Sequence, residues 1–135
     1  MKKLISGLAV SCAALLAALP ACAASPYDGS WEDSVSGRCA MTAETAGDGV
    51  TRFEVRWADS ASTDNVWTFS GRWEGGRLSF SDCRHAVETS DDSGNESVKV
   101  TYTGGRGTVS VSGGRLLWDN FTDRVCRDCR FEKVE

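Results

Sequence analysis

The chain has 135 residues, 25% of them charged, and a formal net charge of −4 at pH 7. Its acidic groups are dispersed and no basic face is evident, which argues against nucleic-acid binding and against electrostatic attachment to anionic lipid. The length corresponds to one small domain after any targeting segment is removed.

Residues 1–24 have the layout of a bacterial secretory signal. Lys2 and Lys3 precede an apolar run over 4–19, and small residues follow, with an A-x-A site at 21–23. Such a run is too short and wrongly flanked for a transmembrane helix, and no hydrophobic segment follows it. We therefore expect an exported protein, periplasmic or secreted, whose single domain covers residues 25–135 and contains no transmembrane segment.

An alternative processing route concerns Cys22. The stretch LPAC at 19–22 looks like a lipobox, although proline at its second position is a poor match. Cys22 would then be the lipidated first residue of a lipoprotein. Lipidation would anchor the protein to a membrane without making it span one.

From residue 25 onward the chain alternates apolar and polar residues, with no convincing helical period. This pattern predicts strands with one buried and one solvent-exposed face, as antiparallel sheets have. In the stretches TRFEVRWA, NVWTFSGRW and ESVKVTYT, the residues expected to share a face are Phe53, Val55 and Trp57, then Trp67, Phe69 and Trp73, then Val98, Val100 and Tyr102.

Glycine-bearing stretches divide these strands at regular intervals. They read AGDGV, WEGGRL, DDSGNE, YTGGRGT and VSGGRL, and glycine there supplies the positive φ of tight hairpins. Only 58–65 (ADSASTDN) resembles a longer loop, and we expect it at the rim of the fold. Short connections favour pairing of successive strands, so the sequence predicts an all-β protein, a small antiparallel up-and-down β-barrel of about eight strands.

Four cysteines follow residue 25, namely Cys39, Cys83, Cys126 and Cys129. In a small exported domain an even number predicts disulfides. A zinc site would need a second ligand pair, so no metal is expected. A thioredoxin-type C-x-x-C would need to lie at a helix N-terminus. Here it precedes a predicted strand, so a redox role is not expected. A closed barrel places its first strand beside its last, so we expect Cys39 to join one of the terminal pair and Cys83 the other. A Cys126–Cys129 bond, which would close a very short loop, is the alternative.

The stretches YDGSW, VWTFSGRW, GGRLSFSDC, GGRLLWDN and CRFEK together resemble a group of small exported lipocalin-like (calycin-type) β-barrel proteins of gut bacteria. The resemblance runs along most of residues 27–133, and its motifs are turn glycines and core aromatics. It implies a lipocalin- or avidin-like barrel. It implies no catalytic residues, because the group has no established activity.

A second similarity concerns SWEDSVSGRCAMTAE, in which a tryptophan precedes a cysteine by about eight residues in the first part of the fold. This spacing looks like that of bacterial metalloprotease inhibitors, whose N-terminal segment enters the protease cleft. That likeness would assign inhibition to residues 25–30. The second cysteine of that family lies much closer to the first than Cys83 lies to Cys39.

Aromatic residues are the candidate ligand-binding set. Aromatic walls with a few polar groups are typical of barrel pockets, although large aromatics also fill the interior of a small barrel. The residues expected to line the interior are Phe53, Trp57, Trp67, Trp73, Tyr102 and Trp118.

No catalytic arrangement is evident. We interpret His85 as a surface or rim histidine. The carboxylates of Asp82, Glu88, Asp91 and Asp92 fall near strand ends and a turn, and we interpret them as solvated loop charges. We therefore expect a non-enzyme without a cofactor, a monomer that binds a small apolar ligand in the barrel or an extracellular protein at its mouth. The alternatives are an inhibitor of an extracellular hydrolase and a structural envelope lipoprotein.

Overall fold

The computed structural model describes residues 25–134, and every regular element in that range is a β-strand. The predicted all-β class is therefore confirmed. The predicted signal peptide and Cys22 lie outside the described residues. Within this range there is no helix long and apolar enough to cross a membrane.

Nine strands follow one another along the chain. They are β1 (Gly29–Asp33), β2 (Cys39–Thr45), β3 (Thr51–Ser60), β4 (Thr63–Gly71), β5 (Trp73–Glu74), β6 (Arg77–Ser90), β7 (Glu96–Ser112), β8 (Arg115–Asn120) and β9 (Phe131–Val134).

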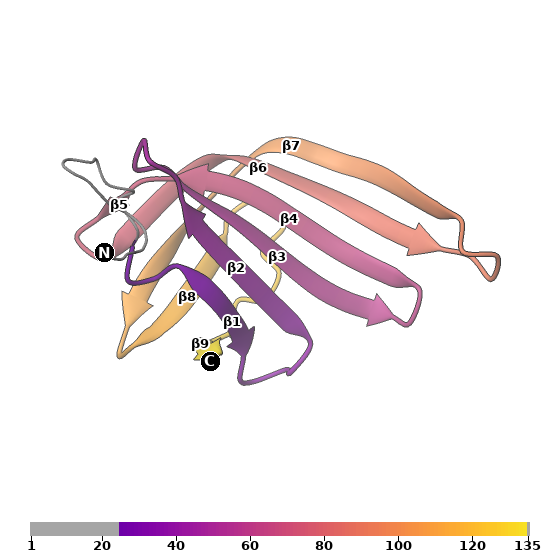
Figure 1. Cartoon of the computed structure of the whole chain (residues 1–135), viewed down its shortest axis with the longest axis horizontal. Helices are drawn as coiled ribbons and strands as arrows, with labels where there is room; N and C mark the ends of the chain where they lie inside the picture. The colour runs from indigo at the N-terminus through magenta and orange to yellow at the C-terminus, as the bar shows by residue number, and fades with distance from the viewer. Residues whose placement is uncertain (1–24, 135) are drawn as a thin grey trace, which may run out of the picture.

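All nine strands belong to one antiparallel sheet that closes in a ring. Its order is β4-β3-β2-β1-β9-β8-β7-β6-β5, and the additional pairing of β4 with β6 closes it. The short strand β5 pairs with the beginning of β6, while β4 pairs with its later part. Apart from the β1–β9 and β4–β6 pairings, the paired strands are successive in the chain, as the uniformly short turns predict. The β3–β4 and β6–β7 hairpins extend beyond the ends of the other strands (Figure 1).

The hydrophobic core fills the inside of the ring. Along each strand every second residue points inward, which is why Thr51, Phe53 and Val55 of β3 are buried, while Arg52 is exposed and Glu54 is half-buried. Trp31, Met41, Leu78, Val109 and Phe131 come from five other strands and meet in the same core.

One expected turn is part of a long strand. YTGGRGT lies inside β7, and its glycines allow close packing within the sheet instead of a chain reversal. A Cβ on Gly107 would lie 2.2 Å from the carbonyl oxygen of Asp119 and 2.5 Å from Phe80. A Cβ on Gly105 would lie 2.7 Å from the Tyr102 ring. The other four glycine stretches do connect strands, as predicted.

Beside this stretch the pairing of β6 with β7 shifts register three times between Phe80 and Ala86. The last shift changes the side of the sheet to which β7 side chains point. Tyr102 lies opposite His85, whereas Val98 and Val100 are 57% and 45% exposed. The expectation that the two valines share a buried face with Tyr102 is therefore wrong.

The expected loop at 58–65 is also mostly strand. β3 runs to Ser60 and β4 begins at Thr63, with a bulge between Ala58 and Ser60. Ion pairs support this extension on its outer face, since Arg56 contacts Asp64 on β4 at 3.3 Å and Glu88 on β6 at 3.0 Å. The long connection is instead residues 121–130, between β8 and β9.

The cysteines differ from the expected pairing. Cys126 and Cys129 form a disulfide, while Cys39 and Cys83 are buried free cysteines. The expected proximity of the first and last strands is confirmed, because β1 pairs with β9. The sulfur of Cys39, at the start of β2, lies within 4.8 Å of the sulfurs of Cys126 and Cys129. Cys83 sits on β6, opposite Gly105 of β7, and is not part of that sulfur cluster.

Candidate functional site

A pocket of about 540 Å³ opens at the end of the ring where the two long hairpins project. We call it the end pocket. Strands β3, β4, β6 and β7 supply its wall, and the 121–130 connection supplies the remaining side. Its lining consists mainly of aromatic and polar side chains: Trp57, Asp59, Asn65, Trp67, His85, Thr101, Tyr102, Asp123, Val125 and Cys126.

Strand register brings the aromatic residues of the end pocket together. Trp67 pairs with His85 across β4 and β6, and His85 pairs with Tyr102 across β6 and β7. The ring centroids of Trp67 and His85 are 4.8 Å apart, and those of His85 and Tyr102 are 5.6 Å apart. Trp57 reaches the pocket from β3, where it is half-buried. Four separate strands thus contribute aromatic side chains to the wall of the pocket.

Asp123 brings a carboxylate to this wall. Its Oδ2 accepts hydrogen bonds from Trp67 Nε1 at 2.9 Å and from the Tyr102 hydroxyl at 2.8 Å. Its Oδ1 accepts one from the backbone amide of Val125 at 3.2 Å. Asn120, at the end of β8, accepts hydrogen bonds from the amides of Thr122 and Asp123 and so shapes the turn that positions this carboxylate.

His85 is held on both sides of its ring. Nε2 donates to the side-chain oxygen of Asn65 at 2.9 Å, and Nδ1 lies in hydrogen-bond contact with the Thr101 hydroxyl. Burial lowers the pKa of His85, and the negative charge of Asp123 opposes that shift without cancelling it. The imidazole is therefore neutral at pH 7. The interpretation of His85 as a surface or rim histidine is wrong, because only 9% of the residue is exposed.

Tyr102 keeps its proton at all physiological pH values. Burial raises the pKa of its hydroxyl, and the hydrogen bond to Asp123 raises it further, while a hydrogen bond from Asn120 opposes the shift. A protonated phenol can donate to the Asp123 carboxylate, which stabilises the carboxylate in turn. Tyr102 is thus a fixed donor in the wall of the end pocket.

A cluster of sulfur atoms lies beside the end pocket. Cys126 lines the pocket and is bonded to Cys129, and Cys39 lies next to both. These three residues are the set in the described chain whose atoms are close enough to hold a metal ion. As a disulfide, however, Cys126 and Cys129 offer no thiolates. Burial, with a contribution from Asp33, raises the pKa of the Cys39 thiol to about 12.

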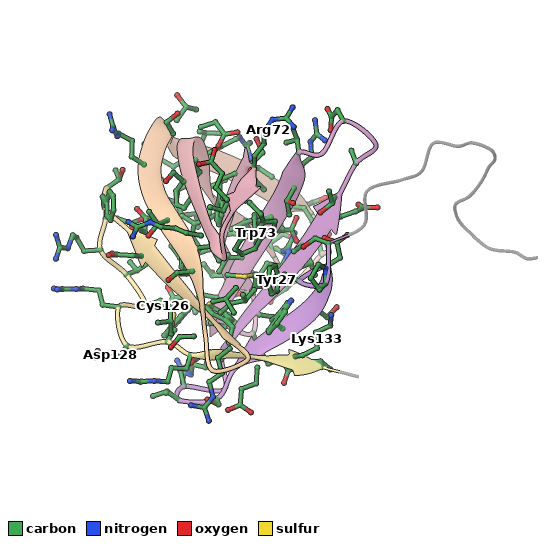
Figure 2. All side chains as sticks on the ribbon, turned by 90° about the vertical axis from the view of Figure 1, so that its left-hand side faces the viewer. Tyr27, Arg72, Trp73, Cys126, Asp128 and Lys133 are labelled. Carbon is green, nitrogen blue, oxygen red and sulfur yellow. A yellow bond between two sulfur atoms is a disulfide. The ribbon has the colours of Figure 1, made fainter. Side chains whose placement is uncertain are left out.

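Three of the six residues expected to bind a ligand line the end pocket: Trp57, Trp67 and Tyr102. The structure places the other three elsewhere. Phe53 stacks on Phe69 in the core at 5.0 Å, and Trp118 is 2% exposed and packs against Trp67. Trp73 packs against Tyr27 (Figure 2), and their ring centroids are 4.6 Å apart.

Sequence reasoning missed the polar members of the site, notably Asn65, Thr101 and Asp123. Asn65 lies in the stretch 58–65 that the sequence predicts as a loop, and the alternation predicted for ESVKVTYT places Thr101 on the face opposite Tyr102. The structure places Asn65 on β4 opposite Trp57, in register with the inward-facing residues. Extending the alternation of Trp67 and Phe69 back by two residues would have placed Asn65 on the inward face. No local signal marks Asp123, because the path of the 121–130 connection decides its position.

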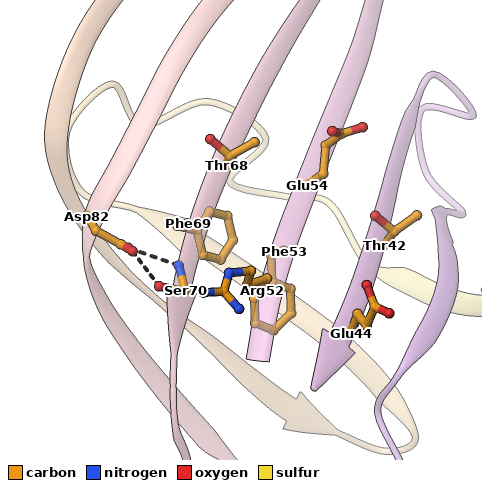
Figure 3. A pocket seen from close by; sticks show the side chains of 9 residues that line it. All are labelled: Thr42, Glu44, Arg52, Phe53, Glu54, Thr68, Phe69, Ser70 and Asp82. Atoms are coloured by element: carbon orange, nitrogen blue, oxygen red, sulfur yellow. Dashed lines mark hydrogen bonds between the residues drawn. The ribbon is translucent and has the colours of Figure 1, made fainter. Parts of the chain in front are cut away.

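A second hollow, of about 420 Å³, lies over the outer face of β2, β3 and β4 (Figure 3). Its side chains are mostly charged or carry hydroxyls, among them Glu44, Arg52 and Glu54. Asp82 accepts hydrogen bonds from the amide and hydroxyl of Ser70 at its edge. It offers less apolar surface to a ligand than the end pocket does, so we regard the end pocket as the candidate site.

Comparison with known proteins finds no family model, no curated protein and no solved structure that matches this chain.

Proposed function

We propose that this protein is a non-catalytic binding module that takes a small ligand with a substantial apolar part into the end pocket. In this proposal the closed ring is a small lipocalin-like barrel, and the protein is an exported monomer, with anchoring through Cys22 as the alternative. The observation that carries the proposal is the pocket itself, about 540 Å³ in size and walled by Trp57, Trp67 and Tyr102. Its size and its mixture of aromatic wall and few polar groups are typical of small-molecule sites.

The state of the polar groups supports binding in preference to catalysis. A general base needs a free lone pair in reach of the substrate, yet both ring nitrogens of His85 already have partners. Asp123 likewise accepts three hydrogen bonds from within the protein. The one cysteine in the lining, Cys126, is bonded to Cys129. These groups are arranged to hold the wall in one shape.

The test is a titration with N-phenyl-1-naphthylamine, a neutral apolar dye whose emission rises in an apolar environment. We expect saturable binding to the purified protein. Trp57→Ala should weaken that binding about tenfold, because it removes aromatic contact area from the pocket wall. Trp73→Ala is the matched control, since Trp73 is also partly buried but does not line the pocket.

Circular dichroism of each variant establishes that the fold is retained. Equal loss of binding in both tryptophan variants would contradict the assignment of the site. Absence of saturable binding to the wild-type protein would contradict the proposed function.

A partner protein that docks at the same end is the second candidate. Val98 and Val100 on the projecting part of β7 are both exposed, and apolar side chains in this arrangement can contact a partner. Serine substitutions at these two positions would weaken such a complex and leave dye binding in the end pocket unchanged. Pull-down with the exported protein from its own cells, followed by comparison with the double variant, separates the two modes.

Inhibition through residues 25–30 has less support from the structure. Tyr27 is packed on Trp73, and Asp28 accepts a hydrogen bond from the Thr45 hydroxyl at 2.6 Å. These contacts hold the segment against the ring. A cleft-inserting segment would have to give up these contacts.

A further inference from the structure

The charges that line the end pocket are negative. Two carboxylates belong to its lining, Asp59 at the exposed rim and Asp123 in the wall. Of the described residues that line it, none is a lysine or an arginine, and His85 is held neutral by its burial. A ligand in this pocket therefore meets two negative charges without a compensating positive one.

Asp123 in particular lacks a cationic partner. It is half-buried, and within the described chain its contacts are hydrogen bonds from neutral groups, with no ion pair. A carboxylate withdrawn from water gains most when a positive charge approaches it, because the local dielectric constant is lower than in bulk solvent. A positively charged ligand in the pocket would supply the cationic partner that Asp123 lacks.

The aromatic wall favours the same kind of ligand. Trp57 and Tyr102 are partly exposed and carry electron-rich ring faces, and cations are attracted to such rings within about 6 Å of their centroids. Groups of tryptophan and tyrosine beside a carboxylate recognise alkylated ammonium ions in general, because these ions combine a spread positive charge with an apolar surface. Val125 adds an aliphatic contact for that surface.

We propose that the end pocket selects an organic cation, in which a quaternary or alkylated ammonium group is joined to a small apolar body. The inference rests on the proposed function, since it names the ligand class of the same pocket. The ammonium group lies among Trp57, Tyr102 and the two carboxylates. Anionic ligands such as fatty acids are disfavoured, because their carboxylates would face Asp59 and Asp123.

The experiment compares two molecules of the same shape and different charge. Choline carries a quaternary nitrogen, and 3,3-dimethyl-1-butanol has a carbon atom in its place. Calorimetric titration of the purified protein with each compound, in buffer free of other organic cations, measures the preference. We expect choline to bind at least about fivefold more tightly than its neutral isostere, within the range that cation–π contacts supply.

Three variants assign the preference to the pocket. Trp57→Leu keeps an apolar side chain but removes the ring, so choline should lose its advantage while the affinity of the isostere is unchanged. Asp59→Asn should weaken choline alone. Asp92→Asn is the matched control, because it removes the same charge from an exposed position outside the pocket lining. A merely structural role for Trp57 would reduce the affinity of both compounds equally.

Each outcome decides something. If the neutral dye binds but choline shows no advantage over its isostere, the inference is overturned and the proposed function stands. An advantage that survives in both Trp57→Leu and Asp59→Asn also overturns it, since the cation would then bind elsewhere. If neither the dye nor either compound binds, the proposed function fails, and this inference fails with it.

Discussion

His85 illustrates how a single side chain links the wall of the end pocket to the stability of the fold. It is the only histidine of the chain, and its neighbours Asn65 and Thr101 occupy both ring nitrogens. Protonation would add a proton at Nδ1, the ring nitrogen that now accepts a hydrogen bond from Thr101, and would place a positive charge in a buried site. The folded protein therefore resists the charged form of this histidine.

We expect the pKa of His85 in the folded protein to lie below its ordinary value of 6.5. The unfolded chain takes up this proton near 6.5, whereas the folded chain takes it up only at lower pH. The free energy of unfolding should therefore decrease as the pH falls from above 6.5 to the folded-state pKa. The NMR titration of the single imidazole measures the pKa directly.

The control for this pH effect is His85→Gln, which cannot titrate. Over the same pH interval its free energy of unfolding should fall less than that of the wild-type protein. A folded-state pKa above 6.5, or the same pH dependence in both proteins, would contradict the assigned environment of His85.

Gly107 shows that a glycine can be required where no turn exists. Any side chain there would meet the carbonyl of Asp119 on β8 and the ring of Phe80 on β6. Gly107→Ala should lower the free energy of unfolding by about 3 kcal/mol, because backbone or core would have to move. Gly47→Ala is the control, since a Cβ at Gly47 has no neighbour within 4 Å, and it should change stability by less than about 0.5 kcal/mol. Equal effects, measured by urea unfolding, would contradict this packing.

At the scale of elements, the connection over 121–130 contributes to the end pocket as the strands do. It carries Asp123, Val125 and Cys126 to the end pocket, and the Cys126–Cys129 disulfide lies within it. Arg124 and Cys126 adopt positive φ angles of 61° and 56°, which few non-glycine residues do. Hydrogen bonds from the Thr122 amide to Asn120 and from the Arg130 amide to Asp33 fix its two ends.

The state of the cysteines is a direct test of this connection. In a protein of residues 25–135 with one disulfide at Cys126–Cys129, the unfolded chain should show two free thiols, those of Cys39 and Cys83. In the folded protein both should react slowly, because burial raises each thiol pKa to about 12. Thiol titration before and after denaturation measures both. Finding no free thiol in the unfolded chain would contradict the structure and support the pairing expected from the sequence.

Strand prediction from the sequence succeeded where one physical signal dominates. Alternation in TRFEVRWA correctly placed Phe53 and Val55 inside, because burial of one sheet face sets the register. It failed in YTGGRGT, where glycine allows close packing of strands, and in ADSASTDN, where polar residues of low strand propensity are held by hairpin pairing and by ion pairs to Arg56. Both failures involve tertiary contacts that local sequence does not contain.

At the scale of the whole molecule, closure of the sheet could be predicted from the short connections between successive strands. The position and lining of the pocket could not. The sequence indicated Trp57, Trp67 and Tyr102, yet it equally indicated Phe53, Trp73 and Trp118, which the ring places outside the end pocket. All six occupy apolar positions in the same period-two pattern of their strands, so the pattern does not distinguish them. Their separation depends on the height of each residue along the ring and on where the 121–130 connection crosses it.

The central claim is that a ligand occupies the end pocket. The most direct measurement uses the indole N–H signals of the five tryptophans in a ¹H–¹⁵N spectrum during titration with N-phenyl-1-naphthylamine. We predict saturable shifts for Trp57 and Trp67, which line the pocket, and none for Trp31 and Trp73. Shifts centred on Trp73, or a spectrum unchanged at saturating dye, would contradict the account.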